Sequence, residues 1–309
     1  MPLRIGLIGI GKIARDQHIP ALRANKSYEL VACASRNAQV EGVANYPDVE
    51  SLLEGTKGLD AISICTPPQA HFTAALMSLR AGCHVMLEKP PTTTTREIAL
   101  LADEARKLGR TLFQTWHSRC AASVDAARDW LRTHRVTRGK IAWKEDVHVW
   151  HPGQRWIWEP GGFGVFDPGI NALSLLTEIL PVEVHVERAR LEFPENLQSP
   201  IAATLLLRTS DGVAIDAEFD FRQKGEQSWD IELETGAGRC KLSRGGANLE
   251  IDGKTVGADE SLAGEYPRLY RRFAQLVAAR ESDVDWRPFQ LVADSFLIGE
   301  RRIVAPHEI

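Results

Sequence analysis

The chain has 309 residues, 44% of them hydrophobic and 25% charged, which is an ordinary composition for a globular protein and enough length for two domains with cores of their own. The formal net charge of -4 gives no electrostatic reason to expect nucleic acid or an anionic membrane as a partner, and no apolar run approaches the roughly 20 residues of a membrane-spanning helix. The five cysteines lack CxxC or Cys/His spacing, and the N-terminal residues lead straight into a strand-like run, so we expect a cytoplasmic protein without disulfides or a zinc site.

The first third of the chain alternates short apolar runs with amphipathic helical segments such as HFTAALMSLRAG and REIALLADEARKLG. The runs predicted to be strands are residues 4–8, 30–34, 61–65, 85–88 and 111–114. Apolar strands interleaved with amphipathic helices are typical of a parallel sheet that is covered on both faces. We therefore predict a doubly wound α/β domain of the Rossmann type over residues 1–118.

A glycine-rich turn follows the first of these strands. In GLIGIGKIA, Gly9, Gly11 and Ala14 form the G-x-G-x-x-A variant of the dinucleotide fingerprint between a strand and a helix. Glycine permits the tight turn and lets a pyrophosphate approach the amides of the helix N-terminus. The alternative is an ordinary strand-to-helix turn. Because the pattern opens a whole set of alternating elements, we predict that Gly9, Gly11, Lys12 and Ile13 bind a dinucleotide.

The end of the second strand bears on the choice of dinucleotide. A site specific for NAD has an acidic side chain there to accept hydrogen bonds from the ribose, whereas a 2′-phosphate needs a cation instead. This chain has Ser35 and then Arg36 at that place. Arginine can hold a phosphate through two hydrogen bonds. We predict that both residues contact the cofactor, with NADP preferred and NAD also used, unless Arg36 is only a solvated surface charge.

From about residue 139 the pattern changes to strands joined by glycine-rich turns. The strand-like segments are IAWKEDVHV, VEVHVERARLEF, IAATLLLRT, GVAIDAEFDF, SWDIELET, GRCKLSR and ANLEID. Several alternate with period two, which is typical of an open antiparallel sheet. We predict an α+β domain over 119–309 with a mostly antiparallel sheet. Helices at 122–133 and 171–180 would cover one face, and helices at 266–280 and 289–302 would close the chain, the C-terminal one being able to pack back on the first domain.

Four motifs in one order carry a family resemblance. They are GLIGIGKIA, CTPPQAH at 65–71, LEKP at 87–90 and GGFGVFDPGIN at 161–171, and together they resemble the glucose-fructose oxidoreductase, inositol dehydrogenase and rhizopine-catabolism family over nearly the whole chain. The resemblance implies a nucleotide-binding domain followed by a substrate domain whose open sheet often forms an oligomer interface, so we expect a homo-oligomer. It also places cofactor contacts on five residues: Thr66, Pro67, His71, Glu88 and Lys89.

Lys89 ends the run VMLEK and is followed by two prolines, which fix the backbone. At the carboxyl end of a parallel strand near the topological switch point, its ammonium would reach both nicotinamide and substrate. An ammonium can donate to a hydroxyl and stabilise the alkoxide character that develops as hydride leaves. We therefore predict that Lys89 is both catalytic and substrate-binding.

Asp167 and Asn171 are four residues apart, so a helix beginning near Pro168 would turn both side chains to one cleft. Asp167 could instead be only a helix N-cap, because Asp before Pro is a common helix start. Many members of the resembled family carry a histidine where this chain has Asn171, and an amide cannot titrate in the working range. We predict that Asp167 is the base and Asn171 holds the substrate. A neutral Lys89 as base, with Asp167 orienting it, remains open.

The segment 117–158 combines the two kinds of side chain that bind sugars, hydrogen-bonding groups and aromatic faces. It holds His117, Arg119, Glu145, Asp146, Trp150, His151, Trp156 and Trp158. Most tryptophans are core or interface residues. From this set we predict His117 and Glu145 as hydroxyl partners and Trp150 as a platform, and the resemblance adds Trp229. The absence of HxH or HExxH spacing speaks against a metal.

Within the resembled family, TWHSRC, WKEDV, WHPGQRWIWEPGG and FDPGINALS look most like members that oxidise L-arabinose. The resemblance implies an NAD(P)-dependent dehydrogenase that oxidises L-arabinose, and D-galactose with the same ring configuration, at the anomeric carbon to the aldonolactone. Two alternatives stay open: a dehydrogenase of another sugar or of a cyclitol, and a non-catalytic regulator of the same fold that senses the nucleotide.

Overall fold

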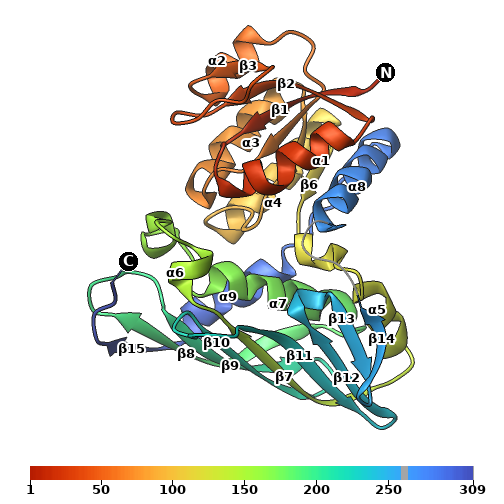
Figure 1. The fold of residues 1–309 in the computed structure, drawn as a ribbon, viewed down its shortest axis with the longest axis vertical. Helices are drawn as coiled ribbons and strands as arrows, with labels where there is room; N and C mark the ends of the chain where they lie inside the picture. The colour runs from red at the N-terminus through yellow and green to blue at the C-terminus, as the bar shows by residue number, and fades with distance from the viewer. Residues whose placement is uncertain (259–263, 309) are drawn as a thin grey trace. The chain divides into compact units, whose positions relative to one another are not determined.

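The computed structural model describes residues 1–258 and 264–308, which form two compact units (Figure 1). The first unit consists of residues 1–116 and 265–286, and the second of the described residues within 117–264 and 287–309. The sequence prediction placed a single division after residue 118. The structure differs from it because residues 265–286 lie in the first unit, while His117 and Ser118 lie in the second.

The sheet of the first unit is parallel, with strand order β3-β2-β1-β4-β5-β6 in the described chain. Its strands are β1 (Leu3–Ile8), β2 (Tyr28–Ala34), β3 (Ala44–Tyr46), β4 (Ala61–Ile64), β5 (His84–Leu87) and β6 (Leu112–Gln114). The five predicted strands are confirmed, and the short edge strand β3 was not predicted. The doubly wound α/β class is therefore confirmed.

Two groups of helices accompany this sheet: α1 packs against α8, while α2 and α4 both pack against α3 (Figure 1). The helical segments are the π-helical turn η1 (Ala14–His18), α1 (Ile19–Ala24), α2 (Val49–Gly55), the turn η2 (Pro68–Ala70), α3 (His71–Arg80), α4 (Thr95–Leu108) and α8 (Glu265–Ala279). The start of α4 shows why the sequence folds this way locally. Thr94 and Glu97 each accept a hydrogen bond from the other's backbone amide, which satisfies two unpaired donors at the helix start.

Helix α8 reaches the first unit from far along the chain and is bonded into it. Tyr28 Oη donates to the backbone oxygen of Tyr270 at 2.7 Å, and the ring of Phe273 stacks on those of Tyr28 and Phe113. The segment after α8 runs beside β6, where Gln114 N donates to Asp283 O at 2.9 Å. These contacts explain why residues 265–286 belong to the first unit.

The second unit is built on a larger, mostly antiparallel sheet with the order β14-β13-β12-β11-β7-β10-β9-β8-β15 in the described chain. Its strands are β7 (Val136–Lys144), β8 (Val184–Pro194), β9 (Ala202–Thr209), β10 (Ala214–Asp220), β11 (Ser228–Thr235), β12 (Gly238–Ser243), β13 (Asn248–Ile251), β14 (Lys254–Ala258) and β15 (Glu300–Val304). Only the pairs β7 with β10 and β8 with β15 are parallel. The open, mostly antiparallel sheet is thus confirmed.

Helices cover one face of this second sheet, with α7 at the centre (Figure 1). The helical segments are the turn η3 (His117–Cys120), α5 (Val124–Leu131), α6 (Val147–Trp150), the turn η4 (Arg155–Trp158), α7 (Phe166–Ile179), the turn η5 (Arg244–Gly246) and α9 (Arg287–Ile298). Nearly every residue of α7 is buried. The glycines of GGFGVFDPGIN make this packing possible, since a Cβ on Gly169 would stand 2.7 Å from the ring of Phe219.

Two predicted elements in the second unit are wrong at their ends. The helix predicted over 289–302 ends at Ile298, and residues 300–304 instead form β15, the edge strand beside β8. The strand predicted over 141–149 ends at Lys144 and gives way to α6, whose first turn is capped by the Asp146 carboxylate accepting from His148 N at 3.0 Å. Pairing with the edge of the sheet made the first segment a strand, and side-chain capping made the second a helix, so these contacts outweighed the local sequence preference.

Candidate active site

The glycine-rich turn after β1 contains two glycines with different roles. Gly9 has a φ of 87°, and a Cβ there would stand 2.7 Å from the backbone nitrogen of Thr66, so the protein itself requires glycine at this position. A Cβ on Gly11 would meet no atom within 4 Å. The space beside Gly11 is therefore open, as a turn that receives a pyrophosphate against helix amides would require.

The two residues after Gly11 lie on the surface of the first helical turn. Ile13 is 38% exposed, and Lys12 is exposed and paired with Asp16. An exposed apolar side chain next to the open space at Gly11 could pack against a planar group of a bound ligand. The turn thus fits the dinucleotide that its sequence predicts.

Ser35 and Arg36 follow β2 at the same edge of the sheet. Ser35 N donates to Tyr46 O at 3.0 Å, which fixes the backbone where the strand ends. Arg36 is exposed, and no hydrogen bond or ion pair within the described residues engages its guanidinium. No carboxylate occupies position 35 or 36, so neither of these residues would repel a 2′-phosphate.

His71 joins the loop after β4 to the loop after β5 rather than lying open to a ligand. The ring is fully buried, with Nε2 at 2.6 Å from Thr66 O and Nδ1 at 3.0 Å from Pro90 O. Burial lowers the pKa of His71, against the opposing effect of these carbonyl oxygens. His71 therefore positions the two loops, while Pro67 is exposed on the same turn and Thr66 is half-buried.

Glu88, next to Lys89, belongs to a buried polar network that the sequence did not predict. Its Oε1 accepts from Tyr266 Oη at 2.9 Å and lies 3.0 Å from His18 Nε2, while its Oε2 accepts from the backbone of Lys89 at 2.7 Å. His18 Nδ1 lies 2.8 Å from Tyr270 Oη. The network ties the backbone of Lys89, which precedes a cis proline, to η1 and α8.

The predicted cofactor residues of the first unit thus follow β1, β2, β4 and β5 and gather at the carboxyl edge of one parallel sheet. This edge, on either side of the point where strand order reverses between β1 and β4, is where open α/β sheets bind ligands. An open glycine, an exposed guanidinium and the helix amides after β1 are the groups that a dinucleotide phosphate needs. When bound, a nicotinamide cofactor supplies a hydride acceptor.

In the second unit, α7 carries Asp167 and Asn171 one turn apart. Helix α7 begins at Phe166 after Val165, so Pro168 is its third residue rather than its first. The alternative that Asp167 is an N-cap is therefore wrong, because Val165 has that position and no side chain caps the helix. Asp167 is 3% exposed.

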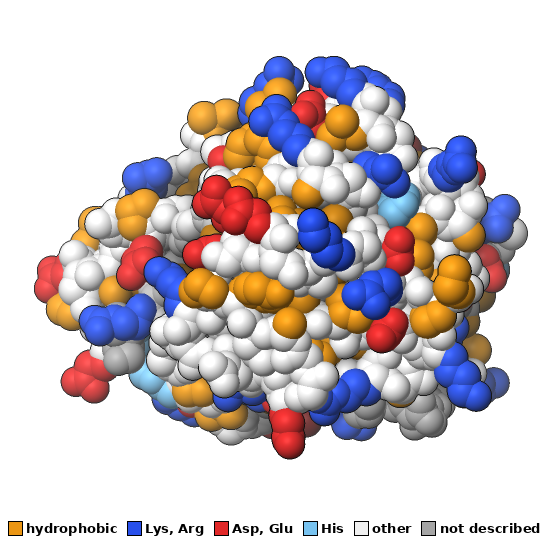
Figure 2. Space-filling model, turned by 90° about the horizontal axis from the view of Figure 1, so that it is seen from above, with side chains coloured by type: hydrophobic (Ala, Val, Ile, Leu, Met, Phe, Trp, Pro, Cys, Tyr) orange, Lys and Arg blue, Asp and Glu red, His pale blue; other side chains and the backbone are white. Residues whose placement is uncertain are grey.

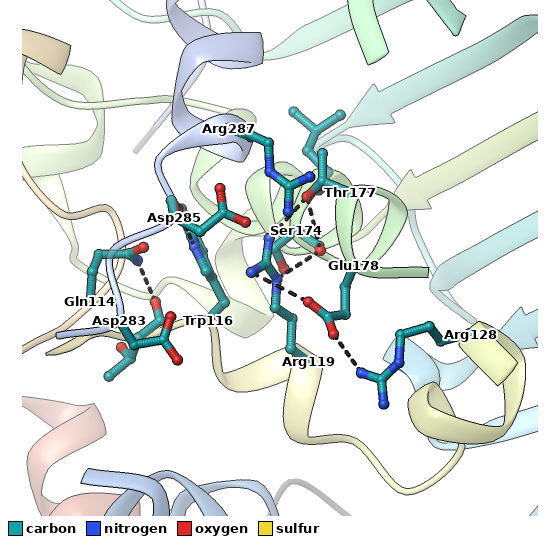
Figure 3. A network of polar contacts seen from close by, with 12 residues as sticks. Gln114, Trp116, Arg119, Arg128, Ser174, Thr177, Glu178, Asp283, Asp285 and Arg287 are labelled. Atoms are coloured by element: carbon teal, nitrogen blue, oxygen red, sulfur yellow. Dashed lines mark hydrogen bonds and ion pairs between the residues drawn. The ribbon is translucent and has the colours of Figure 1, made fainter. Parts of the chain in front are cut away.

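The far half of α7 is anchored by arginines (Figure 3). Arg119, from η3, donates through Nε to Ser174 O and through a terminal nitrogen to Thr177 Oγ1, each at 3.0 Å. Glu178 accepts from Arg128 of α5 at 2.6 Å. Because these bonds fix the rotation of α7, they also fix which way Asp167 and Asn171 face.

Glu145 and Asp167 are brought together by His151, which was not among the predicted site residues. His151 Nε2 lies 2.8 Å from Glu145 Oε1, and its Nδ1 lies 3.5 Å from Asp167 Oδ2. Trp229 Nε1 donates to Glu145 Oε2 at 2.9 Å. Glu145 is 3% exposed and both its oxygens have protein partners, so its geometry suits it to orient His151.

Asn171 has an unsatisfied group in the same unit. It is 9% exposed, and its Oδ1 has no hydrogen-bond partner among the described residues. Such a buried acceptor is costly unless a ligand or water completes it. The rings of Trp150 and Trp229 lie edge to face, with centroids 4.8 Å apart. His117 is buried on η3, which packs against α7, and its Nδ1 lies 3.5 Å from Ser118 Oγ.

Two other kinds of feature, a metal site and a membrane-spanning helix, are not found among the described residues. No group of three or more His, Cys, Asp and Glu in the described ranges is arranged to hold a metal ion. No helix among the described residues is both long and apolar enough to cross a membrane. On the face drawn in Figure 2, acidic and basic side chains of the described residues are interspersed.

Comparison with known proteins agrees with the fold. The model of an oxidoreductase family with an NAD-binding Rossmann fold, GFO/IDH/MocA, matches residues 3–115. The galactose 1-dehydrogenase of Pseudomonas fluorescens is 45% identical over 303 residues, which cover 97% of each chain.

Solved structures extend the comparison. The D-galactose-1-dehydrogenase from Rhizobium etli has a TM-score of 0.94 and 50% identity, covering 99% of this chain and 98% of that one. A 3-ketoreductase from Actinomadura kijaniata, solved with NADP and TDP-benzene, shares the fold with a TM-score of 0.86 at 22% identity, covering 98% of this chain and 100% of that one. The chain therefore belongs to the GFO/IDH/MocA oxidoreductase family, the family that its four sequence motifs resemble.

Proposed function

We propose that the protein is an NAD(P)-dependent sugar 1-dehydrogenase that oxidises D-galactose and L-arabinose at the anomeric carbon to the aldonolactones. The relatives from Pseudomonas fluorescens and Rhizobium etli, 45% and 50% identical over nearly the full chain, are galactose 1-dehydrogenases by name. The two sugars share one ring configuration and differ by the exocyclic hydroxymethyl group. Rejecting or accepting that group is worth only about 1–3 kcal/mol in an unspecialised pocket, so both sugars are expected as substrates.

The observation that carries the proposal is the cluster of the second unit. Two buried carboxylates, Glu145 and Asp167, lie on either side of one imidazole, and Asn171 presents a buried oxygen without a partner. The paired rings of Trp150 and Trp229 lie beside Glu145. A sugar needs such a mixture, because its hydroxyls require hydrogen-bonding groups and its C–H faces require aromatic surface.

We assign the chemical roles as follows. Asp167 takes the proton of the anomeric hydroxyl, and the Lys89 ammonium polarises that hydroxyl and stabilises its developing negative charge. Asn171 donates and accepts hydrogen bonds with neighbouring hydroxyls, and Trp150 and Trp229 support the ring. His117 is assigned to another hydroxyl. The proton thus leaves through the protein, and a bound nicotinamide would supply the hydride acceptor.

NADP is the cofactor that we propose to be preferred, with NAD also used. Arg36 supports this choice, since it is exposed, has no described partner and follows a strand end without a carboxylate. A guanidinium in this state can form two charge-assisted hydrogen bonds to a 2′-phosphate.

A substrate panel tests the proposed function. Purified protein is mixed with NADP or NAD and, in parallel, with D-galactose, L-arabinose, D-glucose and myo-inositol, and the absorbance of reduced nicotinamide is followed. We expect turnover with the first two sugars, and their kcat/KM values should differ by no more than about two-hundredfold. Turnover with myo-inositol alone would move the substrate to a cyclitol. A protein that binds NADP but oxidises none of these compounds would contradict the dehydrogenase proposal and favour a nucleotide-sensing regulator.

We also propose that the protein is a homo-oligomer through the open face of the second sheet. Charges on that face already pair within the sheet. For example, Lys144 pairs with Glu218, and Lys241 Nζ lies 3.0 Å from Asp230 Oδ2. A second copy could cover them without leaving them unpaired. Sedimentation velocity should then give a multiple of the 34.3 kDa chain mass, and Leu206→Lys on this face should lower it. A single species of one chain mass would contradict the proposal.

A further inference from the structure

One imidazole in the second unit is held between two buried carboxylates, and no assigned role yet uses it. His151 follows α6, Glu145 follows β7, and Asp167 lies in the first turn of α7. The ring is 2.8 Å from Glu145 Oε1 through Nε2 and 3.5 Å from Asp167 Oδ2 through Nδ1. Three separate elements are therefore folded so that one ring touches both acids.

The two distances differ in a way that selects one tautomer of the ring. A distance of 2.8 Å is a full hydrogen bond, so Nε2 carries hydrogen and donates to Glu145. In a neutral ring with hydrogen on Nε2, Nδ1 carries the lone pair, and it lies 3.5 Å from Asp167 Oδ2, the carboxylate whose proton it would take. Gln154 Oε1 lies 3.4 Å from Nδ1, and an amide turned to present its NH₂ would suit that lone pair.

Glu145 is itself held in place, which fixes the orientation of the ring. Trp229 Nε1 donates to Glu145 Oε2 at 2.9 Å, and Glu145 N donates to Asp220 O at 2.9 Å. The ring of Phe221 packs against the imidazole with centroids 5.4 Å apart. The groups placed beside His151 thus include Glu145 after β7, Asp167 of α7, the amide of Gln154 and the ring of Phe221. A carboxylate that orients a histidine toward a reacting group is a known way to make the histidine accept a proton.

Asn171, on the same helix as Asp167, cannot accept a proton in the working range. A carboxylate alone is a weak base at neutral pH and benefits from a group that removes its proton. We propose that His151 is the proton acceptor of this site, which takes through Nδ1 the proton that Asp167 removes from the anomeric hydroxyl. This inference rests on the proposed function. The step balances: the O–H bond breaks, its proton ends on Nδ1 and its electron pair forms the carbonyl bond of the lactone, while the C–H bond breaks and a bound nicotinamide would supply the acceptor for that hydride.

Variants of His151 separate a proton acceptor from a structural contact. In His151→Gln, the amide nitrogen replaces Nε2 and keeps the bond to Glu145, but the side chain cannot titrate. We expect kcat with saturating NADP and D-galactose to fall about a hundredfold to ten-thousandfold, with KM for NADP unchanged. The rise of kcat with pH should also lose the step that His151 contributes. His148→Gln is the matched control, because His148 is exposed and lies on α6, the short helix that ends just before His151.

A second variant, His151→Ala, tests the proposal if His151→Gln loses activity because its structure has changed. His151→Ala should regain part of its kcat when imidazole is added, which a purely structural loss would not allow. Near-normal kcat and an unchanged pH profile in a folded His151→Gln protein would overturn the proposal.

A measurement without turnover keeps this inference distinct from the proposed function. In protein labelled with ¹⁵N-histidine, the signal missing from His151→Gln identifies His151. We expect hydrogen on Nε2 at neutral pH and a changed signal in Asp167→Asn. Hydrogen on Nδ1 would overturn the inference whether or not any sugar is oxidised. Hydrogen on Nε2 in a protein that oxidises no sugar would agree with the arrangement of His151 and Asp167 and contradict only the proposed function.

Discussion

Lys89 and Asp167 are the residues on which the proposed chemistry depends. Lys89 has its backbone amide bonded to Glu88 Oε2, and Asp167 is buried beside His151. Lys89→Ala and Asp167→Asn should each lower kcat with D-galactose by about a hundredfold to ten-thousandfold, because each removes a group that we propose to act on the reacting hydroxyl. NADP binding, measured by titration, should persist. Normal turnover in either variant would remove that residue from the reaction.

Arg36 tests the choice of cofactor. Charge-assisted hydrogen bonds contribute about 1.5–3 kcal/mol, so Arg36→Ala should raise KM for NADP about ten- to a hundredfold and change KM for NAD little. Lys26→Ala is a matched control, because Lys26 is also exposed but lies before the same strand, β2, rather than after it. Equal losses with both cofactors would show that Arg36 does not bind the 2′-phosphate.

Single residues differed in how far the sequence could predict their roles. Gly9 and Gly11 were predictable because backbone geometry leaves few alternatives in a strand-to-helix turn. His151 was not, since nothing in the sequence HVWH of residues 148–151 separates it from His148. The capped turn of α6 leaves His148 exposed and brings His151 to Glu145, a contact that depends on where β7 ends.

Helix α8 shows how an element far along the chain can support the nucleotide-binding unit. Tyr266 donates to Glu88 Oε1, and Tyr270 lies 2.8 Å from His18 Nδ1, both in full burial. Tyr266→Phe keeps the ring but removes one donor to a buried carboxylate. We expect the free energy of unfolding at neutral pH to fall by about 1–3 kcal/mol, measured by urea denaturation.

The same variant should reveal a dependence on alkaline pH. Burial, reinforced by the Glu88 charge, raises the pKa of Tyr266 well above its ordinary value. Below pH about 10 both folded and unfolded chains keep the phenol proton, whereas above it only the unfolded chain loses that proton, so stability falls as pH rises. The difference between wild type and Tyr266→Phe should therefore shrink above pH about 10. A difference that stays constant would mean that Tyr266 titrates normally in the folded protein.

Element boundaries were predictable where burial decided them and less so at sheet edges. The strands of the parallel sheet are continuous apolar runs because both their faces are buried. Residues 300–304 have an exposed, charged pattern that resembles the end of a helix, and only pairing with β8 makes them a strand. Gly299 allows the change, since a Cβ there would stand 2.4 Å from Ser295 O.

At the scale of the whole molecule, the sequence predicted both sheets but not how the chain is shared between the units. A change in the sequence pattern marks the boundary between two units only if the chain passes from one unit to the other once. In this protein the chain returns to the first unit after residue 264. The sequence of α8 is that of an ordinary amphipathic helix, and only the contacts of its tyrosines with β2 and with the residue after β5 show where it belongs. Long-range pairing of this kind leaves no local signal.

The central claim is that hydride leaves the anomeric carbon of an aldopyranose. Its most direct test uses D-galactose carrying deuterium at C1, with NADP, and analyses the reduced cofactor by mass spectrometry and the rate by comparison with unlabelled sugar. We expect one deuterium in the reduced nicotinamide and a galactonolactone without deuterium at C1. Reduced cofactor without the label, with deuterium kept in the sugar product, would contradict it.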